Sequence, residues 1–120
     1  MILDTTLKLE AVLAGAVAAN QPEVHVDYED VNKDGRRTNP APFRVALNSN
    51  TDVTILAAPV LNAVREPIYI AIYNKDTAAV TVTVKTDDGS TERIIVKKTI
   101  EAGGTLQYNR QLGWFREAVV

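Results

Sequence analysis

The chain has 120 residues, no cysteine, a formal net charge of −2, 46% hydrophobic residues and 23% charged residues. These values are typical of one globular domain, which at this length buries roughly 65% of its unfolded surface. Without cysteine the chain has no disulfide, thiolate metal site or thiol nucleophile. The basic residues are scattered and form no stripe of the kind that binds nucleic acid, so we expect no nucleic-acid partner.

The first 20 residues contain apolar stretches but do not resemble a targeting signal. They carry Asp4, Lys8 and Glu10, and they lack the basic start and unbroken apolar centre of a signal peptide. Nowhere does the sequence approach the ~20 consecutive apolar residues that a membrane helix needs. We therefore expect a soluble protein that is made in a cytoplasm and has no membrane partner.

The same N-terminal segment gives two secondary-structure signals. Four apolar residues alternate along it as in a β-strand: Leu7, Leu9, Ala11 and Leu13. The alanines of residues 11–19 suit a short helix equally well, and Gly15 weakens both interpretations. We favour the strand.

Residues 24–56 predict three strands. Val24, Val26 and Tyr28 alternate with polar residues, and two further apolar runs cover residues 43–47 and 53–56. A polar loop over residues 30–42 separates the first two strands. The stretch Asn-Ser-Asn-Thr-Asp between the second and third supplies turn formers.

The clearest alternation in the chain lies near its centre. Over residues 80–84 valine alternates with threonine, and over residues 68–73 isoleucine alternates with tyrosine and alanine. Residues 74–77 between them are turn formers, so the two strands are predicted to form an antiparallel hairpin. Two prolines bracket a loop over residues 60–66 just before this pair.

Turn signals then recur to the end of the sequence. Asp88-Gly89 predicts a hairpin into a strand over residues 93–100, since these residue types tolerate positive φ. Two glycines lead into a strand over residues 105–108, and a last strand covers residues 114–120. This spacing is typical of a β-sandwich or barrel.

Together these patterns predict an all-β fold and one main domain. We expect a single antiparallel β-sandwich, jelly-roll-like, of about eight strands over residues 21–120. Residues 1–20 form an N-terminal arm or the first strand.

One stretch matches the first half of a calcium-binding loop. Asp30, Asn32 and Asp34 alternate before Gly35, so their oxygens could converge on an ion. The twelfth position of such a loop needs a bidentate glutamate but holds Ala41, and two arginines follow the glycine. An exposed turn is the simpler interpretation, and we predict no metal site and no cofactor.

The sequence offers little for catalysis. His25 is the only histidine, and it shares one strand face with Asp27 and Glu29, which we interpret as a solvated outer face. No Gly-x-Ser-x-Gly motif or phosphate-cradling loop is present. We therefore expect that the chain is not an enzyme.

Carbohydrate binding is an alternative function. Four aromatic side chains could form a stacking face for sugars: Tyr69, Tyr73, Tyr108 and Trp114. Structural packing is the simpler role, with Trp114 closing one end of the sandwich.

Several motifs along the chain follow a recognisable order. Leu-Ala-Gly-Ala-Val over residues 13–17 comes first, and Leu-Ala-Ala-Pro covers residues 56–59. An apolar strand, an Asn-x-Asp-Thr-Ala turn and a Val-Thr strand then cover residues 70–82. A Gly-x-x-Leu-x-Tyr pattern over residues 103–108 precedes Gly113-Trp114. This order resembles small virion proteins of tailed bacteriophages.

The resemblance covers most of the chain but consists of turn and strand signatures. It implies a structural virion protein without catalytic residues, made in the host bacterial cytoplasm. A head decoration or cement protein is the first interpretation, and a neck, tail or fibre-attachment protein is the second. The implied partner is the major capsid protein or another virion protein.

The N-terminal segment suits contact with a neighbouring subunit, and we expect a homo-oligomer, most simply a trimer. The alternative is that this segment completes its own sandwich. The interface candidates are Leu7, Leu9, Val12, Leu13, Val17, Arg36, Arg37 and Arg44.

Overall fold

The structure, a computed structural model, describes residues 1–117. The end of the strand expected over residues 114–120 lies outside the described residues. Within them the chain forms strands and no helix. The strands are β1 (Lys8–Leu13), β2 (Glu23–Asn32), β3 (Ala41–Ala46), β4 (Val53–Leu56), β5 (Ala63–Tyr73), β6 (Val80–Asp87), β7 (Glu92–Ile100), β8 (Thr105–Asn109) and β9 (Gly113–Glu117).

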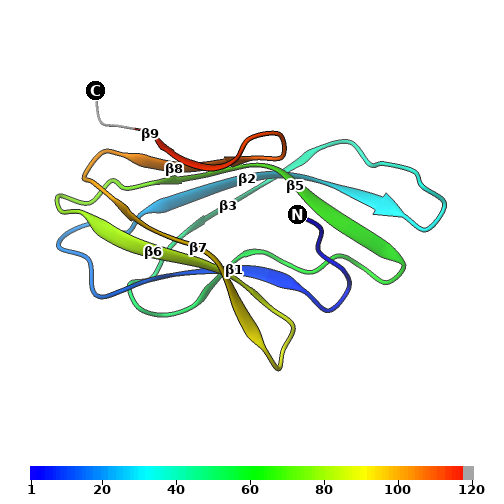
Figure 1. The fold of residues 1–120 in the computed structure, drawn as a ribbon, viewed down its shortest axis with the longest axis horizontal. Coiled ribbons are helices and arrows are strands. Elements are labelled where there is room, and N and C mark those ends of the chain that lie inside the picture. The colour runs from blue at the N-terminus through cyan, green and yellow to red at the C-terminus, as the bar shows by residue number, and fades with distance from the viewer. Residues whose placement is uncertain (118–120) are drawn as a thin grey trace.

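These strands form two antiparallel sheets that lie over one another as a β-sandwich (Figure 1). The four-stranded sheet has the order β4-β1-β6-β7, and the five-stranded sheet has the order β3-β2-β5-β8-β9. The expected all-β antiparallel sandwich is confirmed. The described residues hold nine strands where about eight were expected.

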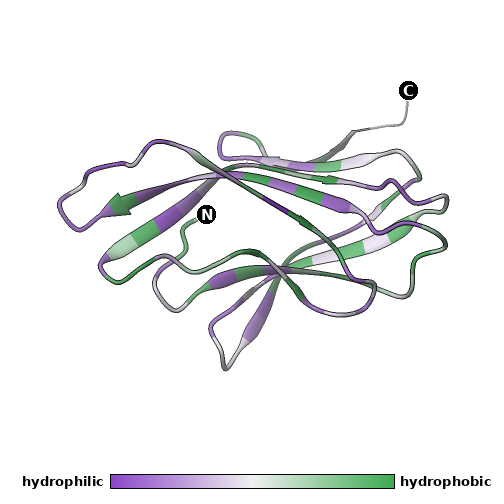
Figure 2. Ribbon diagram, turned by 180° about the vertical axis from the view of Figure 1, so that it is seen from behind, coloured by the Kyte–Doolittle hydropathy of each residue, from purple (hydrophilic) through white to green (hydrophobic). Residues whose placement is uncertain are grey.

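Alternation along the strands places the core between the sheets. On β6 the three valines are buried while Thr81 and Thr83 lie toward the outer face, as a period of two requires. Figure 2 shows the same alternation as hydrophobic and hydrophilic bands along the strands. Both sheets contribute buried side chains, including Leu9, Leu13, Val26, Ile55, Ile70, Ile72, Val82, Val84 and Leu106.

The N-terminal segment is part of the sandwich. β1 lies between β4 and β6, with Leu9 opposite Leu56 and Leu13 opposite Val82. The strand interpretation of this segment is confirmed, and the helix alternative is wrong. Because β1 is paired at both edges within its own chain, it completes its own sandwich.

The predicted hairpin between residues 68–73 and 80–84 is wrong. β5 pairs with β2 and β8, whereas β6 pairs with β1 and β7, so residues 74–79 cross from one sheet to the other. Each strand carries one apolar face. Because the two strands lie in opposite sheets, the apolar face of each is covered by the other sheet.

The loop predicted over residues 60–66 is shorter than expected. β5 begins at Ala63 and continues through Pro67, which lacks an N–H for the sheet. The register between β2 and β5 skips Ile68 at this point, and such a bulge accommodates the proline. The expectation of a loop over residues 63–66 is therefore wrong.

One buried carboxylate organises the end of the sandwich where the chain crosses between sheets. Asp76 is only 4% exposed. Its carboxylate accepts the backbone N–H groups of Ala18 at 2.9 Å, Ala19 at 2.8 Å and Asn20 at 3.0 Å. These hydrogen bonds, that of Ala18 foremost, lower the pKa of Asp76 to about 2. The β5–β6 connection is thereby tied to the segment that follows β1.

Candidate functional site

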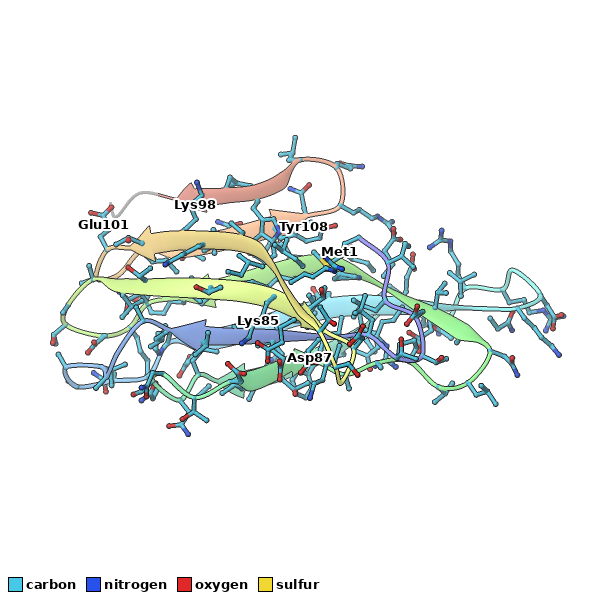
Figure 3. The ribbon with its side chains drawn as sticks, turned by 60° about the horizontal axis from the view of Figure 1, so that its bottom comes forward. Met1, Lys85, Asp87, Lys98, Glu101 and Tyr108 are labelled. Carbon is cyan, nitrogen blue, oxygen red and sulfur yellow. The ribbon has the colours of Figure 1, made fainter. Side chains whose placement is uncertain are left out.

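The outer face of the four-stranded sheet carries a group of charged side chains that we call the acid cluster. It consists of Glu10, Asp52, Asp87 and Glu92 around Lys85. Alternate residues of β1 enter the core, so Glu10 lies on the outer face, opposite Lys85 of β6. Asp87 at the end of β6 is opposite Glu92 of β7. Figure 3 shows Lys85 and Asp87 along β6, near the β6–β7 hairpin.

Lys85 neutralises one side of the acid cluster. Its Nζ lies 2.6 Å from Oε2 of Glu92 and 2.9 Å from Oδ1 of Asp52. These two carboxylates, Glu92 foremost, raise the pKa of Lys85, so it is charged at neutral pH. A second cation, Lys8, lies 3.5 Å from Oε2 of Glu10.

Glu10 is the unusual member of the acid cluster. It is only 5% exposed, and its Oε1 has no hydrogen-bond partner within the described part of the chain. Carboxylate oxygens of Glu10, Asp87 and Glu92 lie within 4.8 Å of one another. Burial, and next the facing carboxyl of Asp87, raise the pKa of Glu10. Such an arrangement can hold a proton or a cation.

A second notable surface is the outer edge of β7. The central residues 93–97 have β6 on one side and no neighbouring strand on the other among the described residues. Ile94 is 67% exposed and Ile95 is 37% exposed, in a strand whose residues are nearly all exposed. Basic side chains flank these isoleucines: Arg93, Lys97 and Lys98.

The outer face of the five-stranded sheet has a shallow groove of about 610 Å³ that contains the only histidine. Arg44 Nε donates a hydrogen bond to Nδ1 of His25 at 3.2 Å, and Nε2 of His25 lies 2.9 Å from Oδ1 of Asp27. Because Nδ1 accepts, Nε2 carries the proton and donates to Asp27. The groove is also lined by Tyr73. The histidine is thus engaged on both sides by surface charges.

Two of the three calcium-loop side chains, those of Asp30 and Asn32, are held by other groups of the chain. Asp30 is paired with Arg65, through Nε at 2.8 Å and Nη2 at 3.0 Å. The side-chain oxygen of Asn32 accepts the backbone N–H groups of Asp34 and Arg36, both at 3.0 Å. These hydrogen bonds form an exposed turn, which agrees with the simpler interpretation of this stretch.

The structure separates the apolar interface candidates into two groups. Leu9 and Leu13 are buried in the core of their own chain, so their prediction as contact residues is wrong. Alternation on β1 directs them inward. Leu7, Val12 and Val17 are half-buried, and Leu7 and Val17 pack against the core.

The basic interface candidates remain at the surface. Arg36 lies exposed in the loop between β2 and β3. Arg37 in the same loop forms ion pairs with Glu29 and Glu66. Arg44 contacts His25. Two of the three arginines are therefore held by groups of their own chain.

The four aromatic residues do not share one face. Tyr69 and Tyr73 lie on the outer face of the five-stranded sheet, whereas Tyr108 and Trp114 pack on its inner side with ring centroids 5.1 Å apart. The stacking face of four rings is thus wrong, because the register places the pairs on opposite sides. The packing role is confirmed for Tyr108 and Trp114.

The acid cluster was not predicted from the sequence. Its members come from β1, from the residue before β4, and from both arms of the β6–β7 hairpin. Only the register of β1, β6 and β7 brings them together. The available signal was a glutamate and a lysine within an otherwise apolar strand, which marks the outer face but not its neighbours.

Comparisons with known proteins find no match to a family model, a curated protein or a solved structure. Within the described residues, no helix is long and apolar enough to cross a membrane.

Proposed function

We propose that the chain is a structural protein of a tailed-phage virion, most simply a head decoration or cement protein. It binds neighbouring subunits through the outer edge of β7. The observation that carries the binding role is this open edge, with Ile94 and Ile95 exposed at its centre. The virion context is supported by the resemblance of the turn and strand motifs described above.

An open edge presents backbone N–H and C=O groups that pair readily with another strand. Many proteins protect such edges with short strands, prolines or bulges. β7 is nine residues long and contains no proline, and its pairing with β6 has one bulge, at Ile95. Arg93, Lys97 and Lys98 flank the isoleucines and suit a partner strand with acidic side chains. In a shell, many copies multiply such weak contacts.

The same edge suits a closed homo-oligomer. β7 and β4 are the opposite edges of the four-stranded sheet, so pairing of β7 with the far edge of the next copy is head-to-tail. Head-to-tail contacts form rings when the rotation closes. We propose a trimer. A neck or tail attachment protein would use the same edge in a ring of another symmetry.

The native mass in solution tests the role of β7. Ile94→Thr combined with Ile95→Lys removes the apolar centre of the edge, and Val60→Thr with Leu61→Lys is the matched control in an exposed loop. Light scattering should give three times the 13.1 kDa of the chain for wild type and control, and 13.1 kDa for the β7 variant. A trimer that survives the β7 change contradicts assembly through this edge. Truncation is a poorer test because β1 belongs to the sheet.

The virion role is tested separately. Phage particles purified from cells that carry the gene should contain the chain in a fixed ratio to the major capsid protein. The β7 variant should be depleted from the particles and the loop control retained. Particles that lack the wild-type chain contradict the virion role whatever its mass in solution.

A further inference from the structure

The acid cluster contains one buried carboxylate oxygen that lacks a donor within the described residues. Glu10 is only 5% exposed, and its Oε1 has no hydrogen-bond partner within residues 1–117. Buried polar atoms in folded proteins almost always have a partner, and an unpaired buried charge is costly. Oε1 of Glu10 therefore requires a hydrogen-bond donor or a cation that the described part of the chain does not supply.

The neighbouring groups cannot supply a donor either. Asp87 faces Glu10, and an ionised carboxylate only accepts hydrogen bonds. One oxygen of Asp87 already accepts the N–H of Gly89 at 2.7 Å. Two acceptors that face each other in a buried site need a proton, a bridging water or a cation between them.

We propose that Glu10, Asp87 and Glu92 bind a divalent cation, Ca²⁺ in the first place, at the base of the β6–β7 hairpin. Their ligand oxygens lie within 4.8 Å of one another. Oxygens that bind one Ca²⁺ at 2.3–2.6 Å are at most about 5 Å apart, so little rearrangement is needed. Mg²⁺ at 2.0–2.1 Å requires a tighter octahedral cage and fits this spacing less well.

The charges of the acid cluster favour a cation. Four carboxyl groups, those of Glu10, Asp52, Asp87 and Glu92, face the two ammonium groups of Lys8 and Lys85. Lys85 pairs with Asp52 and with one oxygen of Glu92. Four carboxyl groups against two ammonium groups leave an excess of two negative charges in the acid cluster. The donors are all carboxylates, which hard cations prefer over soft transition metals.

A bound ion would connect three strands. Glu10 belongs to β1, Asp87 to β6 and Glu92 to β7, and β1 and β7 are not neighbours in the sheet. The ion would fix the start of β7 to the centre of the sheet. It would therefore stiffen the hairpin that projects from the sandwich in Figure 1.

The test uses the full chain and calcium chloride at neutral pH. Calorimetry should show one site with a dissociation constant on the order of 10⁻⁴ M, the range of modest carboxylate sites. Melting in millimolar calcium should occur at a higher temperature than melting in EDTA. Glu10→Gln should weaken binding by at least about tenfold, because ligand charge sets the affinity. Magnesium should bind more weakly than calcium.

Two further variants keep the test decisive. Glu92→Gln changes an exposed member of the acid cluster, so it should fold and lose affinity even if Glu10→Gln folds poorly. Asp34→Asn, in the turn that resembles a calcium loop, is the matched control and should bind as wild type does. Absence of heat and of any melting shift in the wild type overturns the site, and a shared proton or a water then satisfies Glu10. Loss of binding in Asp34→Asn alone also overturns it.

Discussion

Two carboxylates near opposite ends of β6 are buried to the same degree and behave in opposite ways. Asp76 is 4% exposed and Glu10 is 5% exposed. The pKa of Asp76 is lowered to about 2, whereas the pKa of Glu10 is raised. Asp76 accepts backbone N–H groups from the segment after β1, and Glu10 faces another carboxyl group.

The comparison shows that burial alone does not decide the state of an acidic group. Desolvation disfavours the charge in both cases, and hydrogen-bond donors reverse the outcome for Asp76. The chain itself therefore supplies the hydrogen-bond donors of Asp76. The partner of Glu10 Oε1 must come from the solvent.

Asp76→Ala should have the largest effect. It leaves the N–H groups of Ala18, Ala19 and Asn20 without their acceptor in a part-buried place. We expect the melting temperature to fall by about 10 °C or more. Differential scanning calorimetry measures this, with the exposed Asp34→Ala as control. A fall no larger than that of the control would contradict the role of Asp76.

Acid should remove the same stabilisation in the wild type. The pKa of Asp76 is about 2 in the folded chain and ordinarily 3.8, so its contribution is complete above 3.8. It is lost as the pH falls from 3.8 toward 2. Urea unfolding across this range should show a loss of stability that is smaller in Asp76→Asn. Parallel curves for the two proteins would be evidence against this assignment.

Glu10→Gln should have the smallest effect and the opposite sign. Since the folded pKa of Glu10 lies above its ordinary 4.5, the protonated form stabilises the fold below pH 4.5. That stabilisation is lost as the pH rises through the folded pKa. Glutamine keeps the neutral state, so at mildly alkaline pH in EDTA the variant should melt roughly 2–4 °C higher. At pH 4 the wild type and Glu10→Gln should have the same melting temperature. A lower melting temperature of the variant at alkaline pH would contradict the interpretation.

The strands could be predicted from local patterns. β4 has the bounds expected from its apolar run, and the valine and threonine faces of β6 are inner and outer as predicted. A period of two indicates that a strand has one buried face. It does not indicate in which sheet the strand lies. For that reason the pattern predicts a hairpin between β5 and β6 that the structure does not contain.

The two carboxylate sites could not be predicted in the same way. Asp76 was interpreted only as a turn former, but its partners lie 56–58 positions earlier in the chain. Glu10 and Glu92 meet only because β1 and β7 both flank β6. Contacts of this kind depend on topology and register, which local residue types do not specify.

The position of β1 has a consequence for how the chain folds during synthesis. β1 is made first, yet one of its partners is β6, whose residues 82–87 follow much later. Its apolar face, with Leu9 and Leu13, belongs to an incomplete sheet until residue 87 has left the ribosome. Such distant pairing slows folding and exposes apolar strands in the meantime. Of the nine strands described, the first to be made is thus paired on both edges only after the sixth has emerged.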